Sequence, residues 1–352
     1  MIKVNSKLIA FRQIIIIFFT IFVSVDIIKG QSTAGNESFA VLNLFNSAQM
    51  TSRGLSFIPR FSDDVSSALT NPSTINDSLN NKGAITYTDL FGSTYQASLT
   101  FSHKFKTVGN LGFGLQYINY GNFQSTEPNG DITGTFHANE FVFTLGWGMQ
   151  IEKNIYLGAT VKPLFSQYER YSSFSIAFDI ATTYVSPSKM WQVAMILKNI
   201  GKQISSFNLI RDTLPTDLQL GFSKKFSHAP LILYVVVDNI TKWNIRENDI
   251  LNPRDNISID GAIRKENKIS SFLDKGFRHL QFAIDIKPSA SWYISLGYSW
   301  RRHQEMKIND AFSLSGISYG LGIKWRKFSL NYARNEYHKY GSPNYITLGY
   351  IF

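Results

Sequence analysis

The sequence contains no cysteine, few charged residues and only one long hydrophobic run. Cysteine is absent from its 352 residues and charged residues make up 17%. A disulfide framework and thiolate chemistry are therefore excluded. After residue 30, no stretch offers the roughly 18 consecutive apolar residues that a transmembrane helix needs. Aromatic residues reach 14%, and there are 24 glycines. This aromatic-rich, glycine-rich and helix-poor composition is typical of a β-barrel.

Catalytic and metal-binding motifs are also scarce. The six histidines, at positions 103, 137, 228, 279, 303 and 338, are dispersed without metal-ligand spacing. Asp63-Asp64 could bind a cation, but two carboxylates alone are a weak site, and an acidic pair at a helix start is the better interpretation. No phosphate loop, dinucleotide fingerprint or nucleic-acid motif is present. We therefore predict no metal site, no cofactor and no nucleic-acid partner.

Residues 316–320, Gly-Ile-Ser-Tyr-Gly, match the G-x-S-x-G pattern of a nucleophile elbow. That motif requires a strand, a strained turn and a helix. Here it lies within an alternating stretch, 311–325, in which Ser318 shares the small face with glycines. We therefore expect Ser318 to be a small residue facing the barrel lumen and predict no catalytic residues, although an outer-membrane esterase could be argued from Ser318 alone.

The N-terminus predicts export. Three basic residues precede an apolar run from Ile14 to Val25, and Gly30 follows. This order is that of a secretory signal peptide, which we expect to span residues 1–30; the alternative is an uncleaved anchor. Of the 35 basic and 25 acidic residues, four and one lie in this segment, which leaves 31 and 24 and a net charge of +7. An anionic lipid or lipopolysaccharide surface suits such an exported protein.

The last nine residues, 344–352, alternate strictly. Ile346, Leu348, Tyr350 and Phe352 share one face of the predicted strand. Such a strand at a chain end would be an exposed edge in a soluble sandwich, whereas a closed barrel pairs it with the first strand. Terminal Phe after alternating apolar residues also resembles the recognition signal of bacterial outer-membrane barrels. Leu348, Tyr350 and Phe352 are therefore the predicted assembly signal.

Similar alternation recurs from residue 83 onward, with a large apolar face and a small or polar face. This pattern predicts an all-β fold, a transmembrane antiparallel β-barrel over 83–352. Trp292 and Trp300 are eight residues apart, about 26 Å along a strand, so we expect their indoles at opposite membrane interfaces. The predicted strands are about fourteen: 83–89, 94–105, 110–120, 138–150, 154–166, 172–185, 190–199, 216–225, 230–239, 277–287, 291–302, 311–325, 327–335 and 344–352.

One predicted strand is apolar on both faces, at residues 231–237. A strand that lines a water-filled pore should carry polar side chains on its inner face. Residues 31–82 are mixed in character and do not alternate, with a possible short helix that ends at Asn71-Pro72. We therefore expect residues 31–82 to form an N-terminal plug that covers Ile232, Tyr234 and Val236.

A series of short stretches after the signal peptide carries a family likeness: 39–46, Asp63-Asp64 to Asn71-Pro72, 116–121, 197–202, 214–215, 218–221, 223–224, 228–230, 239–240 and 242–243. In this order, they resemble the PorQ family of type IX secretion, which is related to PorV and to fatty-acid-transporter-like barrels. The resemblance covers most of the chain after the signal peptide. It implies a non-enzymatic outer-membrane protein that anchors a surface attachment complex containing PorZ, PorU and PorV.

The largest predicted loop, 240–276, is the candidate partner surface. It mixes charges with the apolar residues Trp243, Ile245, Ile250 and Phe272. These side chains could fold the loop onto the barrel rim, or they could form the centre of a protein interface, which we favour. The fold equally permits a channel for hydrophobic small molecules, and only the resemblance separates the two functions.

Overall fold

The computed structural model describes residues 39–207, 211–246, 256–257, 263–264, 267–307, 313–338 and 341–352. The predicted signal peptide, residues 31–38 of the predicted plug and Ile250 lie outside the described residues. Among the described residues, no helix is long and apolar enough to cross a membrane.

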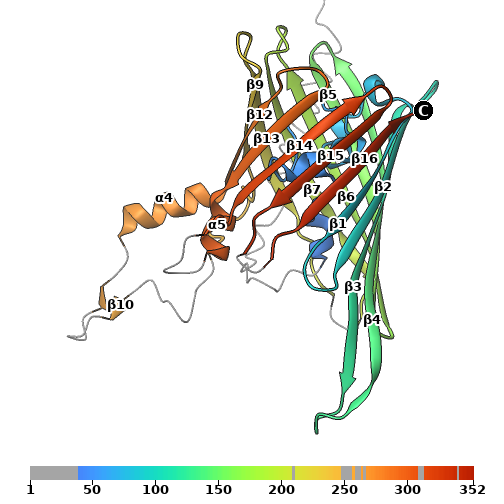
Figure 1. Ribbon diagram of the computed structural model, residues 1–352, viewed down its shortest axis with the longest axis vertical. Coiled ribbons are helices and arrows are strands. Elements are labelled where there is room, and N and C mark those ends of the chain that lie inside the picture. Colours follow the sequence, from blue (N-terminus) through green and yellow to red (C-terminus); the bar gives the residue numbers. More distant parts are fainter. Residues whose placement is uncertain are drawn as a thin grey trace, which may run out of the picture.

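Fourteen antiparallel strands close into one barrel (Figure 1), which confirms the predicted fold class. Closure occurs between the first and last strands, which pair from Lys82↔Ile351 to Asp89↔Asn344. The barrel strands are β1 (Lys82–Asp89), β2 (Tyr95–Phe105), β3 (Gly109–Thr126), β4 (Ile132–Glu152), β5 (Ile155–Tyr168), β6 (Tyr171–Val185), β7 (Trp191–Ser205), β8 (Asp217–Lys225), β9 (Leu231–Val237), β12 (Leu280–Ile286), β13 (Trp292–Ser299), β14 (Ile317–Trp325), β15 (Phe328–Asn335) and β16 (Asn344–Ile351).

The two ends of the barrel differ. Connections 106–108, 153–154, 186–190, 226–230, 287–291 and 326–327 lie at the end that also carries Phe352, and we call it the short-turn end. The opposite, long-loop end carries the connections 206–216, 238–279, 300–316 and 336–343. There β3 and β4 also continue past the other strands as an extended hairpin, which reaches the bottom of Figure 1.

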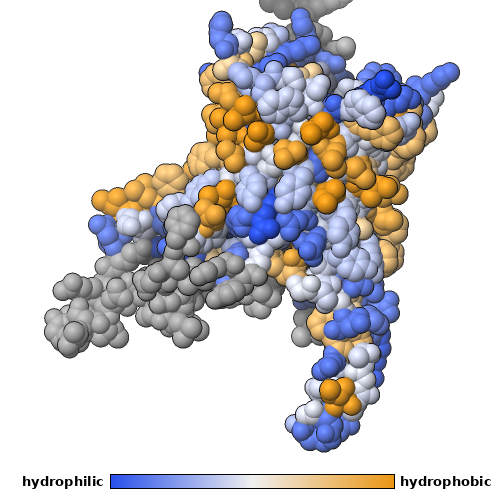
Figure 2. Space-filling model, viewed as in Figure 1, coloured by the Kyte–Doolittle hydropathy of each residue, from blue (hydrophilic) through white to orange (hydrophobic). Residues whose placement is uncertain are grey.

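The strand faces follow the alternation in the sequence. Outward side chains such as Phe143, Leu296 and Leu348 are exposed. In contrast, Tyr345 and Thr347, on the inner face of β16, are almost fully buried. Figure 2 shows the resulting hydrophobic colour over the barrel wall. A wall with apolar residues outside and packed residues inside is the reverse of a water-soluble sandwich.

At the long-loop end, three predicted strands are too long, beside two helices, and three others continue further than predicted: β3 to Thr126, β4 from Ile132 and β7 to Ser205. The strand predicted from residue 277 begins at Leu280, because α4 (Lys268–Arg278) precedes it. The strand predicted to residue 302 ends at Ser299, whose side chain caps α5 (Trp300–Met306). The strand predicted from residue 311 begins at Ile317. A two-stranded ribbon, β10 (Asn256–Ile257) with β11 (Ile263–Arg264), lies outside the barrel sheet.

Residues 39–81 lie inside the barrel as a chain of short helices, and we call them the plug (Figure 1). Ser47 caps α2 with hydrogen bonds from two backbone amides, and Asp64 caps α3 with one. The elements are η1 (Ala40–Asn43), α2 (Ala48–Thr51), α3 (Val65–Thr70), η2 (Pro72–Thr74) and η3 (Asp77–Leu79).

Candidate functional site

An ion pair inside the lumen joins the plug to the barrel wall. Arg53 Nε donates to Asp285 Oδ1 at 2.9 Å and its Nη2 donates to Oδ2 at 2.7 Å. Both residues are almost completely buried, at 2% and 0% exposed. The guanidinium also lies 5.4 Å from the ring centres of Tyr234 and Tyr293. A bidentate pair between aromatic rings fixes the position and orientation of the plug.

The carboxylate of this pair is saturated with donors. Asp285 accepts from Ser295 at 2.6 Å and from Tyr234 at 2.9 Å, and Lys287 lies 3.6 Å away. Burial opposes a charged Arg53, but Asp285 and the surrounding rings favour it, and the net effect raises the pKa of Arg53. Arg53 therefore stays charged opposite Asp285.

Further hydrogen bonds hold the plug to strands all round the barrel. Ser56 donates through its backbone N to Gln281 at 2.7 Å and through its hydroxyl to Gln219 at 2.9 Å. Ala48 N donates to Thr347 on β16 at 3.0 Å, and Gln96 on β2 donates to the carbonyl of Phe45 at 2.8 Å. On β6, Thr183 bonds Ser73 at 2.7 Å. The plug is thus attached on several sides.

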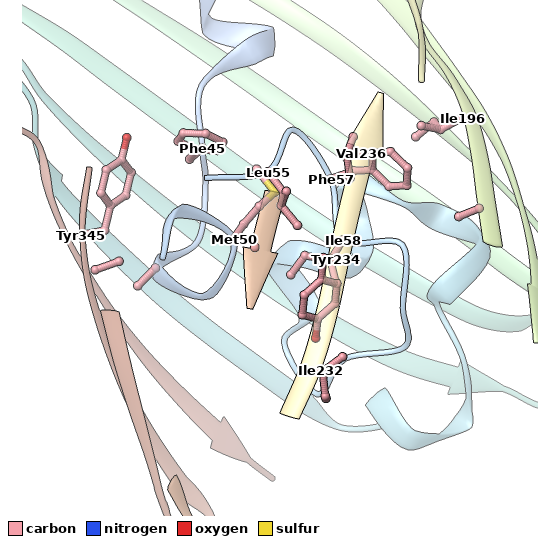
Figure 3. Close-up of a cluster of buried hydrophobic side chains, with 14 of the residues drawn as sticks. Phe45, Met50, Leu55, Phe57, Ile58, Ile196, Ile232, Tyr234, Val236 and Tyr345 are labelled. Atoms are coloured by element: carbon pink, nitrogen blue, oxygen red, sulfur yellow. The ribbon is translucent and has the colours of Figure 1, made fainter. Parts of the chain in front are cut away.

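The apolar inner face of β9 is covered by the plug, as the sequence predicted. Ile232, Tyr234 and Val236 belong to one buried cluster with plug residues, and Figure 3 shows Leu55, Phe57 and Ile58 beside β9. The plug contributes Phe45, Ala48, Met50, Leu55, Phe57 and Ile58 to this cluster. The double-sided apolarity of residues 231–237 therefore has two causes: the inner face packs on the plug, and the outer face, with Leu233 exposed, belongs to the apolar outer wall of the barrel.

Glycines on the inner wall allow the plug to approach the strand backbone. A Cβ added to Gly158 would lie 2.1 Å from the carbonyl carbon of Pro72, and one added to Gly297 would lie 2.0 Å from the carbonyl oxygen of Arg53. No side chain fits at these distances. Glycines on the inner face of the strands are therefore a sequence signal for a tightly packed plug. The fold prediction used the alternation of side chains and overlooked this signal.

The spaces left around the plug at the short-turn end are small and have polar as well as apolar linings. One cavity of about 70 Å³ lies beside Asp63, Asp64 and the β1–β16 seam. A second of about 270 Å³ is lined by the basic side chains of Arg53, Arg60, Lys287 and Lys324 together with Asp63. Burial and the neighbouring Arg53 lower the pKa of Lys287 to about 8.

Asp63 and Asp64 have different partners. Asp63 pairs with Lys324 of β14, whereas Asp64 accepts hydrogen bonds from Ser47 and from the backbone N of Ser66. Asp64 therefore caps α3, in agreement with a helix-start role for this residue. No cluster of three or more metal-ligating side chains occurs in the described part of the chain.

Ser318 is fully buried in the lumen, where its hydroxyl donates to Asn335 at 2.8 Å and accepts from Arg302 at 3.1 Å.

The predicted assembly residues form the outer surface of the seam. Leu348 and Phe352 are exposed at 59% and 67%. The Phe352 ring lies 5.8 Å from Phe101 and 4.9 Å from Tyr350, and its backbone N donates to Asn81 at 2.8 Å. The terminal aromatic residue thus covers the junction of β1, β2 and β16.

The two tryptophans of the predicted girdle lie at opposite ends of β13. Trp292 begins the strand at the short-turn end and is exposed. Trp300 is the first residue of α5 at the long-loop end, where its indole donates to Asp274 at 2.9 Å and lies 6.1 Å from the Phe277 ring.

A buried carboxylate supports the base of the β3–β4 extension. Glu140 accepts from Ser166 at 2.6 Å and from Tyr120 and Tyr168 at 2.8 Å each. These residues join β3, β4 and β5 just inside the rim. The extension itself carries a stacked pair, Phe123 and Phe136, at 5.3 Å. The prediction from the sequence did not include this extension and assigned residues 121–137 to a loop between two strands.

Around the candidate partner loop, the described residues separate into a buried anchor and an exposed helix. Ile245 is buried, whereas Trp243 and Phe272 are exposed at 52% and 62% and their rings lie 5.5 Å apart. Asp274 of α4 pairs with Arg246 at 2.9 Å and with Arg278 at 3.0 Å. Arg278 also reaches Glu305 of α5 at 3.6 Å. This ionic network joins α4 to α5.

No family model matches the chain, and no curated protein matches it. Several solved structures resemble the chain at low identity and TM-scores below 0.5. The "TodX monoaromatic hydrocarbon channel deltaS2 mutant" is 14% identical, with 80% of this chain and 92% of that chain covered and a TM-score of 0.46. A Pseudomonas aeruginosa FadL homologue is 12% identical, with 87% and 98% covered and a TM-score of 0.48. The "CymD monoaromatic hydrocarbon channel" is 11% identical, with 89% and 97% covered and a TM-score of 0.48.

Proposed function

We propose that this protein is a non-enzymatic outer-membrane barrel, closed by its plug, that anchors partner proteins at the cell surface. A belt of exposed apolar side chains on a closed barrel supports the membrane location. Apolar belts of this extent are not stable in water, and closure leaves no unpaired strand edge in lipid. Because outer-membrane barrels have short periplasmic turns, the long-loop end faces the exterior.

The observation that carries the anchoring role is the filled lumen. The plug is hydrogen-bonded to several strands and pinned by the Arg53–Asp285 pair. Of the cavities that remain at the short-turn end, the one of about 70 Å³ has a mixed polar and apolar lining, and the one of about 270 Å³ has a basic lining. An apolar molecule would have to displace the plug or cross a cationic surface. In contrast, the long-loop end offers an extended hairpin and two helices outside the lumen.

The partners implied by the sequence resemblance are PorZ, with PorU and PorV, in the attachment complex of type IX secretion. Support for these names comes from the matching stretches of sequence alone. The docking surface we propose is the long-loop end, which comprises the β3–β4 extension and the 240–276 connection. Anionic lipopolysaccharide is a further partner suited to the positive net charge.

The second candidate is a channel for hydrophobic small molecules. It is favoured by the channels among the solved structures of similar fold, two of which are named as monoaromatic hydrocarbon channels. In that role the plug would have to move, because it occupies the lumen in this structure.

Deletion of the gene separates the two roles. We expect loss of surface attachment of secreted cargo, with unchanged uptake of hydrophobic substrates. Complementation with a chain lacking residues 246–270, bridged by a short Gly/Ser linker, then tests the 240–276 connection, provided that the barrel still assembles. Normal cargo attachment in the deletion strain, together with lost hydrocarbon uptake, would reject the anchoring role in favour of the channel.

A further inference from the structure

The α4 helix carries its large apolar residues on its most exposed side. Ile269, Phe272, Leu273 and Phe277 are exposed at 71%, 62%, 51% and 45%. At 100° per residue they share one face of the helix. Asp274 and Arg278 lie on the other face, where the ionic network holds α4 against Arg246 and α5. In a surface helix of a soluble protein the apolar face would be the one that packs against the protein.

The position of α4 brings this apolar face to the barrel's own lipid-facing belt. Figure 1 shows α4 leaving the long-loop end sideways, across the barrel axis rather than along it. In Figure 2, seen from the same side, hydrophobic colour follows the upper edge of α4, toward the short-turn end, and hydrophilic colour lies beneath it. The apolar side of the helix therefore faces the zone that the membrane occupies around the barrel.

The aromatic and charged groups around the helix also suit a membrane interface. Trp243 stacks between Phe272 and His279, at 5.5 Å from each ring, and Trp300 lies beside Phe277. Indoles concentrate at the boundary between lipid tails and headgroups. In 240–246 and 267–278 there is one acidic residue, Asp274, against five basic residues, which are Lys242, Arg246, Lys268, Lys275 and Arg278.

We infer that α4 is an interfacial helix that lies in the outer leaflet of the outer membrane, with its apolar side among the acyl chains and Lys268 and Lys275 at the anionic headgroups. This inference rests on the proposed outer-membrane location. It assigns the apolar side of α4 to lipid and leaves the polar side and the β3–β4 extension for protein partners. Attachment to the membrane surface would hold the 240–276 connection in a defined orientation.

The absence of cysteine allows a direct test by single-cysteine labelling. Ile269→Cys places a fluorophore on the apolar side of α4, and Lys275→Cys places one on the other side. Leu330→Cys, on the outer face of β15, is the control inside the membrane, and Asn129→Cys, in the β3–β4 turn, is the control in water. The full chain is reconstituted in anionic vesicles that contain lipid brominated near the headgroup, and quenching is measured.

We expect quenching at 269 and 330, little at 275 and 129, and weaker quenching at 269 when the vesicles are zwitterionic. Quenching at 330 without quenching at 269 would overturn the inference while leaving the barrel in the membrane, and would make the apolar side available to a protein partner. Equal quenching at 269 and 275 would also overturn it, because the helix would then be immersed. Absence of quenching at 330 would reject the membrane location itself, and the inference with it.

Discussion

Replacing Arg53 with methionine should release the plug from the β12 wall without emptying the lumen. The change leaves Asp285 buried at 0% exposure without its bidentate partner. Removing one member of a buried ion pair typically costs roughly 3–5 kcal/mol. Asp285 keeps hydrogen bonds from Tyr234 and Ser295 and has Lys287 3.6 Å away, so we expect the lower end, about 3 kcal/mol.

Hydrogen exchange of the plug amides in the reconstituted protein measures this cost. A loss of about 3 kcal/mol corresponds to roughly a hundredfold faster exchange where local opening controls the rate. The matched control is Arg60→Met, in the same segment, because Arg60 lines the basic cavity, donates a hydrogen bond to the Lys189 carbonyl at 3.3 Å and forms no ion pair with a described residue. Its exchange should change little.

A second variant tests whether the unpaired charge is the cause. Arg53→Met combined with Asp285→Leu replaces the pair with apolar groups of similar size, and such replacements are often neutral. We expect the double variant to recover most of the protection lost in Arg53→Met. The reasoning would be refuted if Arg53→Met exchanged no faster than Arg60→Met, or if the double variant were worse than the single one.

Three further predictions concern packing, assembly and pH. Gly158→Ala should lower the temperature at which the folded band is lost in heat-modified gels, by overpacking that costs about 1–3 kcal/mol, whereas Gly134→Ala, with open space around it, should not. Phe352→Asp should lower outer-membrane abundance, because a charge would replace the aromatic cover of the seam; normal abundance would contradict the assembly role. Burial opposes a low pKa at Asp274, but Trp300, Arg278 and Arg246 outweigh it and lower the pKa. Above the ordinary carboxyl pKa of about 4, the charged contacts of Asp274 should therefore stabilise the α4–α5 unit. This stabilisation should be lost as the pH falls through the lowered pKa of Asp274, and hydrogen exchange in α4 should become faster. Asp274→Asn should show the same faster exchange already at neutral pH.

The barrel was predictable from the sequence because its side chains obey one local rule. Alternation of large apolar and small residues specifies strands that face lipid and lumen, and the double-sided apolarity of 231–237 indicated a covered inner face. The pairing of residues 83–89 with 344–352 then followed from closure.

The long-loop end was harder to predict because tertiary contacts there override local patterns. Residues 300–302 continue the alternation of β13, yet Ser299 caps a helix and the Trp300 indole bonds Asp274. The β3–β4 extension contains glycine and polar residues that resemble a loop, and strand pairing with its neighbour extends it. The Arg53–Asp285 pair joins residues 232 positions apart, a distance over which sequence periodicity carries no information.

Ion conductance of the intact protein in planar bilayers tests most directly whether the barrel is closed. The filled lumen predicts no stable open state, with at most brief openings that become more frequent in Arg53→Met. A high and steady conductance of the unmodified protein would contradict the closed barrel and, with it, the observation on which the anchoring role rests.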